Sequence, residues 1–202
     1  MQSVFGGKTC SQLLCEKCGT VRNRYEEFYD LSLEAKNMKS LNDSLEKFIS
    51  PERIDEYQCD TCNKKVTITK RNSIAELPNV LICHLQRIFY NYEIDRNEKI
   101  NSRLEFPKFL NLMPYSTEEI MKTNHEKSSQ ENEEFYFKHS SYYEYLLVGV
   151  VVHTGSADSG HYYSYINTNR TGEYNNLSYN PDVEEQAKNW LEYNDSRISK
   201  FK

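Results

Sequence analysis

The 202-residue sequence lacks any long hydrophobic run, and this absence argues against a membrane protein. No apolar stretch approaches the ~20 residues that a membrane-spanning helix needs. No apolar run follows Met1 either, so we expect no secretory signal peptide. The expected partners therefore include no membrane.

The sequence also lacks a basic patch, internal repeats, a phosphate-binding P-loop and a dinucleotide-binding glycine motif. We expect no nucleic-acid partner and no organic cofactor, and the formal net charge of −5 at pH 7 favours a basic partner. Tyrosine, by contrast, is abundant, and the sixteen tyrosines suggest broad amphipathic surfaces suited to gripping another protein. The length fits one domain, or one large piece of a domain, with a hydrophobic core.

The six cysteines indicate a metal site rather than a disulfide framework. Four of them form two CxxC pairs, Cys15 with Cys18 and Cys59 with Cys62. This spacing is typical of a structural Zn²⁺ site, in which protein thiolates fill all four positions and leave none open for catalysis. Forty residues separate the two pairs, so the metal would join two hairpins distant in sequence, as in a zinc ribbon. The alternative is a site that has lost its metal, or four unrelated thiols.

Thiolate ligands require a reducing compartment, so we expect an intracellular protein, cytoplasmic and/or nuclear. Two further cysteines, Cys10 and Cys83, stand alone. Cys10 is a candidate nucleophile, which would need activation by a nearby base. We favour the alternative that Cys10 is a small apolar residue beside the first CxxC pair.

The stretch YLLVGVVVHTGSADSGHYYSYI, residues 145–166, predicts two strands joined by a loop. Its first nine residues are almost continuously apolar and β-branched, as in a strand that is buried on both faces. The loop Gly155–Gly160 contains only small residues, and its glycines can adopt positive φ. A strand rich in aromatic residues follows from Tyr162. This pattern places His161 at the mouth of a strand, behind a flexible loop, where a base can meet a substrate.

A second strand-like run, Trp190–Ser196, ends in an amide and a carboxylate, Asn194 and Asp195. A histidine followed by a later Asn or Asp supplies two of the three members of a nucleophilic triad. The alternative is that His161 is a structural hydrogen-bonding residue at a strand end.

The remaining pattern predicts strands, one short helix and two polar inserts. A strand at residues 25–33 carries Glu26, Glu27 and Asp30, which either face a basic ligand or form a solvated surface. His84 falls in an apolar run and is interpreted as a core or groove-lining residue. The other expected elements are a helix at 40–48 with Ser40 as N-cap, strands at 65–77, 80–88 (buried and central) and 104–110 (at an edge), a surface loop at 90–103, and polar inserts near 116–141 and 168–185.

Several of these motifs form one ordered pattern. The chain contains, in order, CxxCG, ExFxxLxL at residues 26–33, a second CxxC, LPxVLxxHLxR at 77–87, KINxxxxFP at 99–107, GHYYSYI at 160–166 and a terminal W/Y–N–D. The set closely resembles the ubiquitin-specific protease family of cysteine deubiquitinases, over nearly the whole chain outside the two inserts. The resemblance implies an α+β, papain-like hand of antiparallel sheet, with zinc-ribbon fingers at about 10–80 and a palm at about 80–202.

The resemblance also implies roles for individual residues. His161 matches the general base and Asn194 the residue that orients its imidazole, while Asp195 is expected to assist Asn194 or to stabilise an oxyanion. The expected reaction is hydrolysis of the bond at the C-terminal glycine of ubiquitin, and the expected partners are ubiquitin and ubiquitinated proteins. The expected substrate-binding residues are Glu26, Glu27, Asp30, Gly155, Ser159, Gly160 and Tyr162, the glycines letting a Gly-Gly tail thread a narrow channel.

The sequence departs from the family pattern at the nucleophile. The family's thumb segment, with a box similar to Asn-x-Gly-Asn-Thr-Cys well before the first CxxC pair, has no match here, and Cys10 shares only Thr-Cys with it. We therefore expect that thumb and nucleophile are absent from this chain, which alone would be inactive. Three hypotheses stay open: a piece of an active deubiquitinase, which we favour, a ubiquitin-binding module without hydrolysis, and a zinc-ribbon scaffold for another partner.

Overall fold

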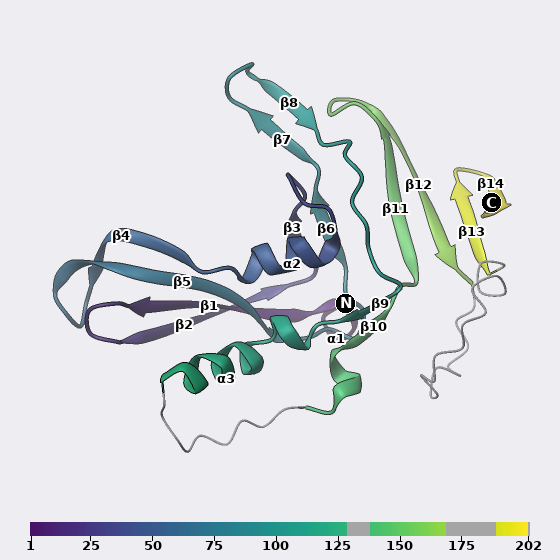
Figure 1. Cartoon of the computed structure of the whole chain (residues 1–202). Helices are drawn as coiled ribbons and strands as arrows, with labels where there is room; N and C mark the ends of the chain where they lie inside the picture. The colour runs from purple at the N-terminus through teal and green to yellow at the C-terminus, as the bar shows by residue number, and fades with distance from the viewer. Residues whose placement is uncertain (129–137, 169–188, 202) are drawn as a thin grey trace. The chain divides into compact units, whose positions relative to one another are not determined.

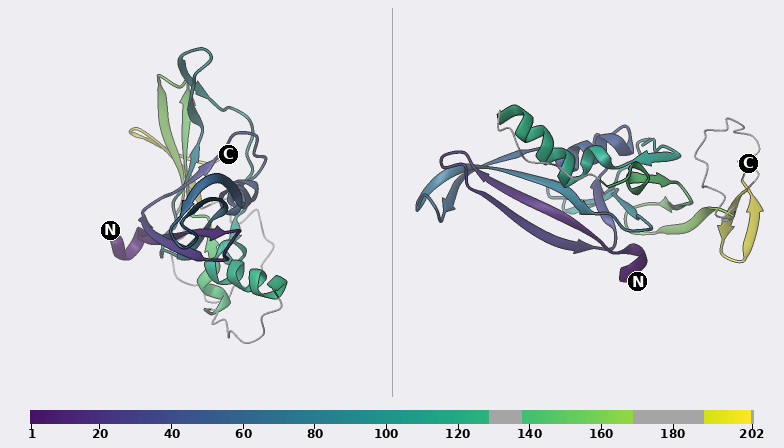
Figure 2. Two further views of the ribbon diagram at one scale, coloured as in Figure 1. Left: turned by 90° about the vertical axis from the view of Figure 1, so that its left-hand side faces the viewer. Right: turned by 90° about the horizontal axis from the view of Figure 1, so that it is seen from below.

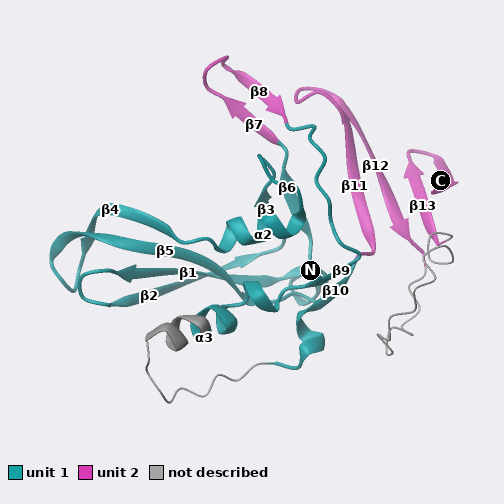
Figure 3. Ribbon diagram, in the orientation of Figure 1, with its two compact units in different colours: residues 1–87, 100–146 teal, residues 88–99, 147–202 magenta. Residues whose placement is uncertain are grey.

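The computed structural model describes residues 1–128, 138–168 and 189–201 (Figure 1). As expected from the sequence, the fold is α+β with mostly antiparallel sheets. The chain forms two compact units (Figure 3), the first made of residues 1–87 and 100–146 and the second of residues 88–99 and 147–202. Among the described residues, no helix is long and apolar enough to cross a bilayer.

Two long β-hairpins dominate the first unit. They pair side by side into an antiparallel sheet of order β2-β1-β5-β4 (Figure 2). Because β1 and β5 are the central pair, with Cys15 opposite Ile68, the far ends of the two hairpins lie together. The strands are β1 (Gly7–Cys15), β2 (Val21–Phe28), β4 (Glu52–Cys59) and β5 (Lys64–Glu76).

The main core of the first unit lies around helix α2 (Leu41–Ile49) and two small sheets. Strands β3 (Leu31–Glu34) and β6 (Cys83–Gln86) pair in parallel, and β9 (Phe109–Asn111) pairs with β10 (Glu144–Leu146). The buried residues of this core are Leu31, Leu33, Ala35, Leu41, Leu45, Ile74, Leu104, Leu110, Leu112 and Tyr115. The other helices of this unit are α1 (Gln2–Phe5), η1 (Met113–Tyr115), α3 (Thr117–Ser128) and η2 (Ser140–Tyr143).

The described residues of the second unit form two antiparallel pieces. One is the hairpin of β7 (Ile88–Asn91) and β8 (Arg96–Lys99). The other is a four-stranded meander of order β11-β12-β13-β14. Its strands are β11 (Gly149–Gly155), β12 (Gly160–Asn167), β13 (Trp190–Asn194) and β14 (Arg197–Lys200).

The helix predicted at 40–48 and the strand predicted at 65–77 are confirmed as α2 and β5. The helix begins with a capping box, in which the Ser40 side chain accepts from the Asp43 N–H and the Asp43 carboxylate accepts from the Ser40 N–H. The hairpin arrangement expected for the two CxxC pairs is also found.

Several predicted strands differ from the observed ones. The strand predicted at 25–33 is divided at Tyr29 and Asp30 into β2 and β3, which belong to different sheets. The apolar run from 145 is divided into β10 and β11, and it is not buried on both faces, because Val151 in β11 is 73% exposed. An apolar run shows only that some face is buried, and it does not locate the break between two sheets.

The predicted central strand at 80–88 is shorter and less buried than expected. Only residues 83–86 form β6, and alternate residues along the run are exposed, including Ile82, His84 and Gln86. His84 is therefore not a core residue. The predicted edge strand at 104–110 begins only at Phe109.

The loop predicted at 90–103 and the predicted inserts also need revision. Residues 88–99 form the β7–β8 hairpin, whose turn includes Asp95 at φ 53° and a hydrogen bond from the Tyr90 hydroxyl to the Asp95 carboxylate. The predicted insert at 116–141 contains helix α3 and the start of η2. Its residues 129–137, and nearly all of the insert at 168–185, lie outside the described residues.

Candidate metal centre and candidate active site

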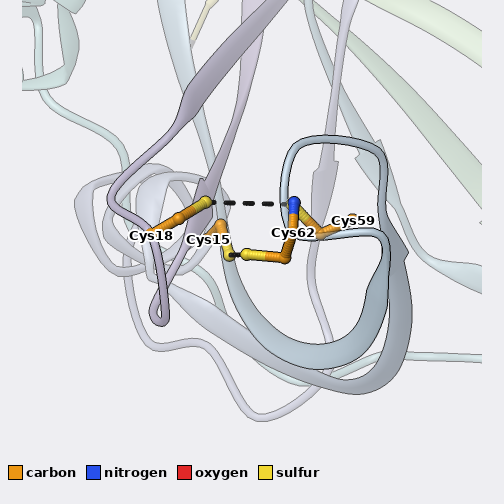
Figure 4. A group of neighbouring side chains, drawn as sticks. All are labelled: Cys15, Cys18, Cys59 and Cys62. Carbon is orange, nitrogen blue, oxygen red and sulfur yellow. Dashed lines mark hydrogen bonds between the residues drawn. The ribbon is translucent and has the colours of Figure 1, made fainter.

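The two CxxC motifs meet at the ends of the two long hairpins (Figure 4). In each motif the first cysteine ends a strand, β1 or β4, and the second lies in the turn that follows. The residue directly after each motif, Gly19 or Asn63, has a positive φ, 70° and 50° respectively. Gly and Asn adopt this left-handed conformation most readily, so both turns close in the same way.

The four cysteine sulfurs fit a tetrahedral metal site. All four Sγ atoms lie within 4.8 Å of one another, and the Cys15–Cys62 and Cys18–Cys59 Sγ distances are 3.8 and 3.9 Å. A tetrahedron with metal–sulfur bonds of about 2.3 Å has edges of about 3.8 Å. All four are free cysteines, so none is in a disulfide. Cys15 and Cys59 are buried and pack with Ile68 in one small hydrophobic cluster.

The local electrostatics also favour a bound cation. The Thr20 hydroxyl lies 3.1 Å from the Cys18 sulfur, and its hydrogen bond to the thiolate lowers the pKa of Cys18 to about 6. Hydrogen bonding to Cys18 raises the pKa of Cys62 to about 12. Contact between these sulfurs therefore favours loss of the proton at Cys18 and its retention at Cys62. A divalent cation at the centre stabilises all four thiolates together.

In the second unit, His161 and Asn194 are brought together by neighbouring strands. His161 is the second residue of β12 and Asn194 is the last residue of β13. The register pairs Ser164 with Tyr193, so Asn194 is opposite Tyr163 and diagonal to His161 on the same face. The His161 Nε2 atom lies 2.6 Å from the Asn194 Oδ1 atom, within hydrogen-bonding distance.

This hydrogen bond defines the state of the imidazole. An amide oxygen only accepts hydrogen bonds, so the Nε2 atom of His161 carries the hydrogen and donates it to Asn194. In the neutral ring the other nitrogen, Nδ1, then keeps its lone pair and can accept a proton. The His161 side chain is 46% exposed, so it is open to an approaching reactant.

Asp195 also lies near the imidazole. Its Oδ2 atom is 3.8 Å from His161 Nε2, and its side chain is 80% exposed. With Ser196 it forms the two-residue turn between β13 and β14, where Asp195 has a φ of 51°. At this distance the carboxylate makes no hydrogen bond to the neutral ring, but it would attract a protonated one.

The turn between β11 and β12 is closed by its own hydrogen bonds. Gly155 pairs with Gly160, the Ser156 N–H donates to the Ser159 oxygen at 2.8 Å, and the Ser159 N–H donates to the Ser156 hydroxyl at 3.2 Å. Gly155 has a φ of 115°, as the sequence led us to expect of a loop glycine.

Gly160 is required for a different reason, close approach. A Cβ atom at Gly160 would lie 2.1 Å from the Nε2 atom of His153 and 2.2 Å from the Thr154 oxygen. The His153 ring also contacts Tyr162, with a centroid distance of 4.5 Å. Tyr162 follows His161 directly in β12, so these two side chains point to opposite faces of the sheet.

Sequence reasoning missed one residue near this turn, Lys99. Its ammonium donates to the backbone oxygens of His153 and Gly155, at 2.9 and 3.1 Å. The only signal in the sequence is the position of Lys99 in the KIN motif, and nothing in its spacing indicates contact with residues more than 50 positions away.

The three acidic candidates lie in the first unit, and all are exposed. Glu26 and Glu27 are consecutive in β2 and point to opposite faces, so only one of them can face a given ligand. Glu26 is 3.1 Å from Arg24, and Asp30 accepts a hydrogen bond from the Ser32 hydroxyl at 3.2 Å. These contacts are compatible with a ligand surface and with a solvated one.

Neither of the two remaining cysteines is set up as a nucleophile. Cys10 in β1 is only 1% exposed, and burial raises the pKa of its thiol. Burial also raises the pKa of Cys83, to about 11. A reactive cysteine needs the opposite, an accessible thiol with a lowered pKa.

Comparison with known proteins identifies one family. A family model described as ubiquitin carboxyl-terminal hydrolase matches residues 1–202. Human ubiquitin carboxyl-terminal hydrolase 9Y is 33% identical to this chain over 211 residues, and the match covers 100% of the chain. The Drosophila melanogaster protein named probable ubiquitin carboxyl-terminal hydrolase FAF is 33% identical over 210 residues, and this match also covers 100% of the chain. The chain spans only 8% and 7% of the lengths of these two relatives.

A solved structure gives the same result for the fold. The structure titled SAGA Ubp8/Sgf11/Sus1/Sgf73 DUB module bound to ubiquitin aldehyde superposes with a TM-score of 0.71 at 25% sequence identity. The superposition covers 99% of this chain and 38% of that one. The likeness therefore extends over the long hairpins, the small core and the meander.

Proposed function

Because the chain belongs to the ubiquitin carboxyl-terminal hydrolase family, we propose that it forms the part of a cysteine deubiquitinase that carries the general base. The reaction is hydrolysis of the isopeptide or peptide bond at the C-terminal glycine of ubiquitin. The partners are ubiquitin and ubiquitinated proteins, and the nucleophilic cysteine comes from outside residues 1–202. The observation that carries the proposal is the 2.6 Å hydrogen bond between His161 and Asn194.

In this proposal the imidazole of His161 moves the protons. Its Nδ1 atom takes the proton of the cysteine thiol, and the thiolate attacks the carbonyl carbon of the terminal glycine. The same nitrogen then gives the proton to the departing amine as the thioester forms. In the second half His161 takes a proton from water, the hydroxide attacks the thioester, and the proton returns to the cysteine sulfur.

Asn194 and Asp195 support the imidazole in different ways. Asn194 holds the ring with Nδ1 free, because its amide oxygen fixes the hydrogen on Nε2. Asp195 stabilises the imidazolium that exists between the two proton transfers, through its charge at 3.8 Å.

The metal is proposed to be Zn²⁺ with a structural role. Cys15, Cys18, Cys59 and Cys62 would hold it, and they leave no open position for a substrate or water. It would join the ends of the two long hairpins, in addition to the strand pairing and the Arg22–Asp60 and Arg53–Glu16 ion pairs that already link them. Thiolate zinc ligands also support an intracellular location, cytoplasmic and/or nuclear.

Residues 10–80 are proposed to act as fingers and residues 80–202 as palm. In this reading Glu26, Glu27 and Asp30 face basic groups on ubiquitin. Residues around the β11–β12 turn bind its C-terminal tail, namely Gly155, Ser159, Gly160 and Tyr162.

A second candidate function is ubiquitin binding without hydrolysis. The observation that favours it is that none of the six cysteines of this chain is both free of the metal cluster and chemically suited to attack. The two candidates share the metal and the ubiquitin surface, and they differ only in whether a nucleophile from elsewhere reaches His161.

The test uses the full-length protein that contains this chain and a ubiquitin with an electrophile at its C-terminus. We expect covalent labelling, and we expect His161→Ala to slow it by about 10²-fold or more because the thiol loses its base. His139→Ala, a histidine that caps η2 in the first unit, is the matched control and should label at the wild-type rate.

Labelling that survives His161→Ala unchanged would refute the role of His161. If the wild-type protein binds ubiquitin but is never labelled, the binding module is the correct function. If it neither binds nor is labelled, both proposals fail.

A further inference from the structure

Lys99 connects the β7–β8 hairpin to the end of strand β11. It is the last residue of β8, where it pairs with Ile88. Its ammonium donates to two backbone oxygens of β11, those of His153 and Gly155. Both acceptors precede the turn that leads to His161.

The two bonds occupy the edge of the meander. Strand β11 pairs with β12 and forms one edge of the four-stranded sheet. Carbonyl groups two residues apart on a strand point to the same side, so one ammonium can reach both. The oxygen of Thr154, which lies between them, faces β12, because a Cβ on Gly160 would lie 2.2 Å from it. Lys99 therefore takes the hydrogen-bonding positions that another strand would otherwise fill at this edge.

One of the two acceptors, Gly155, is the residue at which the β11–β12 turn begins. Gly155 has a φ of 115°, a conformation that only glycine adopts freely. Glycine can also adopt many other backbone conformations, so contacts with neighbouring groups are needed to keep Gly155 in this one. The charged Lys99 ammonium makes stronger hydrogen bonds to these oxygens than a neutral donor would.

We propose that Lys99 is a positioning residue for His161. By holding the oxygens of His153 and Gly155, it sets where β11 ends and where the turn begins. The register then pairs Thr154 with His161, so a shift at the end of β11 moves the imidazole relative to Asn194. The effect of Lys99 on catalysis rests on the function proposed above, whereas its effect on the position of the turn does not.

Hydrogen exchange tests the structural part in the full-length protein. In Lys99→Met, which keeps the length of the side chain but removes the donors, the amides of residues 154–161 should exchange about tenfold faster. Lys99→Arg should keep most of the protection because guanidinium also donates to two oxygens. Lys200→Met makes the same change on β14, in the sheet that contains β11 and β12. It is the matched control and should leave the exchange of these amides unchanged. The amides of β5 show whether each variant is folded.

Labelling with electrophilic ubiquitin tests the catalytic part. Lys99→Met should slow labelling by about tenfold, with ubiquitin affinity changed by less than about twofold, because the lost bonds position a base rather than hold the ligand. Lys99→Arg should restore most of the rate.

The outcomes separate this inference from the proposed function. Equal exchange at residues 154–161 in Lys99→Met and Lys200→Met overturns the inference, whatever the labelling shows. Faster exchange with an unchanged labelling rate overturns the link from Lys99 to His161. If the wild-type protein is not labelled at all, the proposed hydrolysis fails, and the exchange comparison still decides whether Lys99 positions the turn.

Discussion

The His161 Nε2 atom lies 2.6 Å from the Asn194 Oδ1 atom although 33 positions separate the two residues in the sequence. Each side chain comes from a strand of the same sheet, so the distance between them depends on the register of β12 with β13. A strand register cannot slip by one residue without turning every side chain to the other face. The register of the sheet therefore brings these two side chains together.

The first prediction concerns this pair. Asn194→Ala should slow labelling by electrophilic ubiquitin by about 10²-fold, because the imidazole loses the acceptor that fixes its orientation and tautomer. Asn194→Asp should retain much more activity, since a carboxylate also accepts from Nε2–H. The exposed Asp195, 3.8 Å away, gives the comparison, and Asp195→Ala should have the smaller effect. A larger loss in Asp195→Ala than in Asn194→Ala would reverse the assignment.

The second prediction concerns Gly160. In Gly160→Ala the new methyl would lie 2.1 Å from His153 Nε2 and 2.2 Å from the Thr154 oxygen, so the turn must shift. We expect a loss of about 1–3 kcal/mol in the free energy of unfolding, measured with denaturant. Adding His153→Ala should recover only part of it, because the backbone oxygen stays.

Gly149→Ala is the control for the Gly160 variant. It lies in the neighbouring strand β11, and its Cβ would be 3.6 Å from the nearest atom, the Tyr165 oxygen, which is an ordinary contact. Equal stability of the two alanine variants would show that the close approach at Gly160 is relieved without cost.

The sequence alone was enough to select both groups of side chains on which the proposed function depends, the four clustered cysteines and the His161–Asn194 pair. The CxxC spacing is local, and two such pairs predict one another because a metal needs four ligands. The sequence could also identify His161 and Asn194 as candidates, because His161 lies near the start of one recognisable strand and Asn194 ends another. The helix at 40–48 was equally accessible because its capping box and its apolar positions fall within nine residues of one another.

What the sequence could not supply depends on contacts between distant segments. The break between β10 and β11 falls inside an apolar run, and only strand pairing distinguishes the two halves. The β7–β8 hairpin has polar residues that also fit a loop, so only the pairing of its two short strands distinguishes it from one. The contact of Lys99 with the end of β11 has no local signature, since backbone oxygens are the same in every residue.

The third prediction concerns the pH dependence of the capping box. Hydrogen bonds from the backbone N–H of Lys39 and from Ser40 to the Asp43 carboxylate lower the pKa of Asp43. A lowered pKa stabilises the fold above the unfolded value of about 3.9, and the contribution is lost as the pH falls through the lower folded value. Asp43→Asn should therefore be less stable than wild type at pH 7, and the difference should shrink below about pH 4.

Unfolding by urea at several pH values measures the effect of Asp43→Asn. Asp158→Asn, in the exposed β11–β12 turn, is the control and should show no such pH-dependent difference. A stability difference for Asp43→Asn that is the same at pH 3 and pH 7 would mean that the charge of Asp43 contributes nothing.

The last prediction concerns the metal. Cys59→Ser should release the zinc and loosen the joined ends of the long hairpins, because a hydroxyl is a poor zinc ligand at neutral pH and the remaining thiolates repel one another. Cys83→Ser, a half-buried cysteine outside the cluster, is the matched control. Elemental analysis should find one zinc fewer per chain in Cys59→Ser only, and its unfolding temperature should fall well below that of Cys83→Ser. A chelator should lower the wild-type unfolding temperature and leave that of Cys59→Ser unchanged. If both cysteine variants keep the same metal content and melt together, the four cysteines do not hold a structural metal.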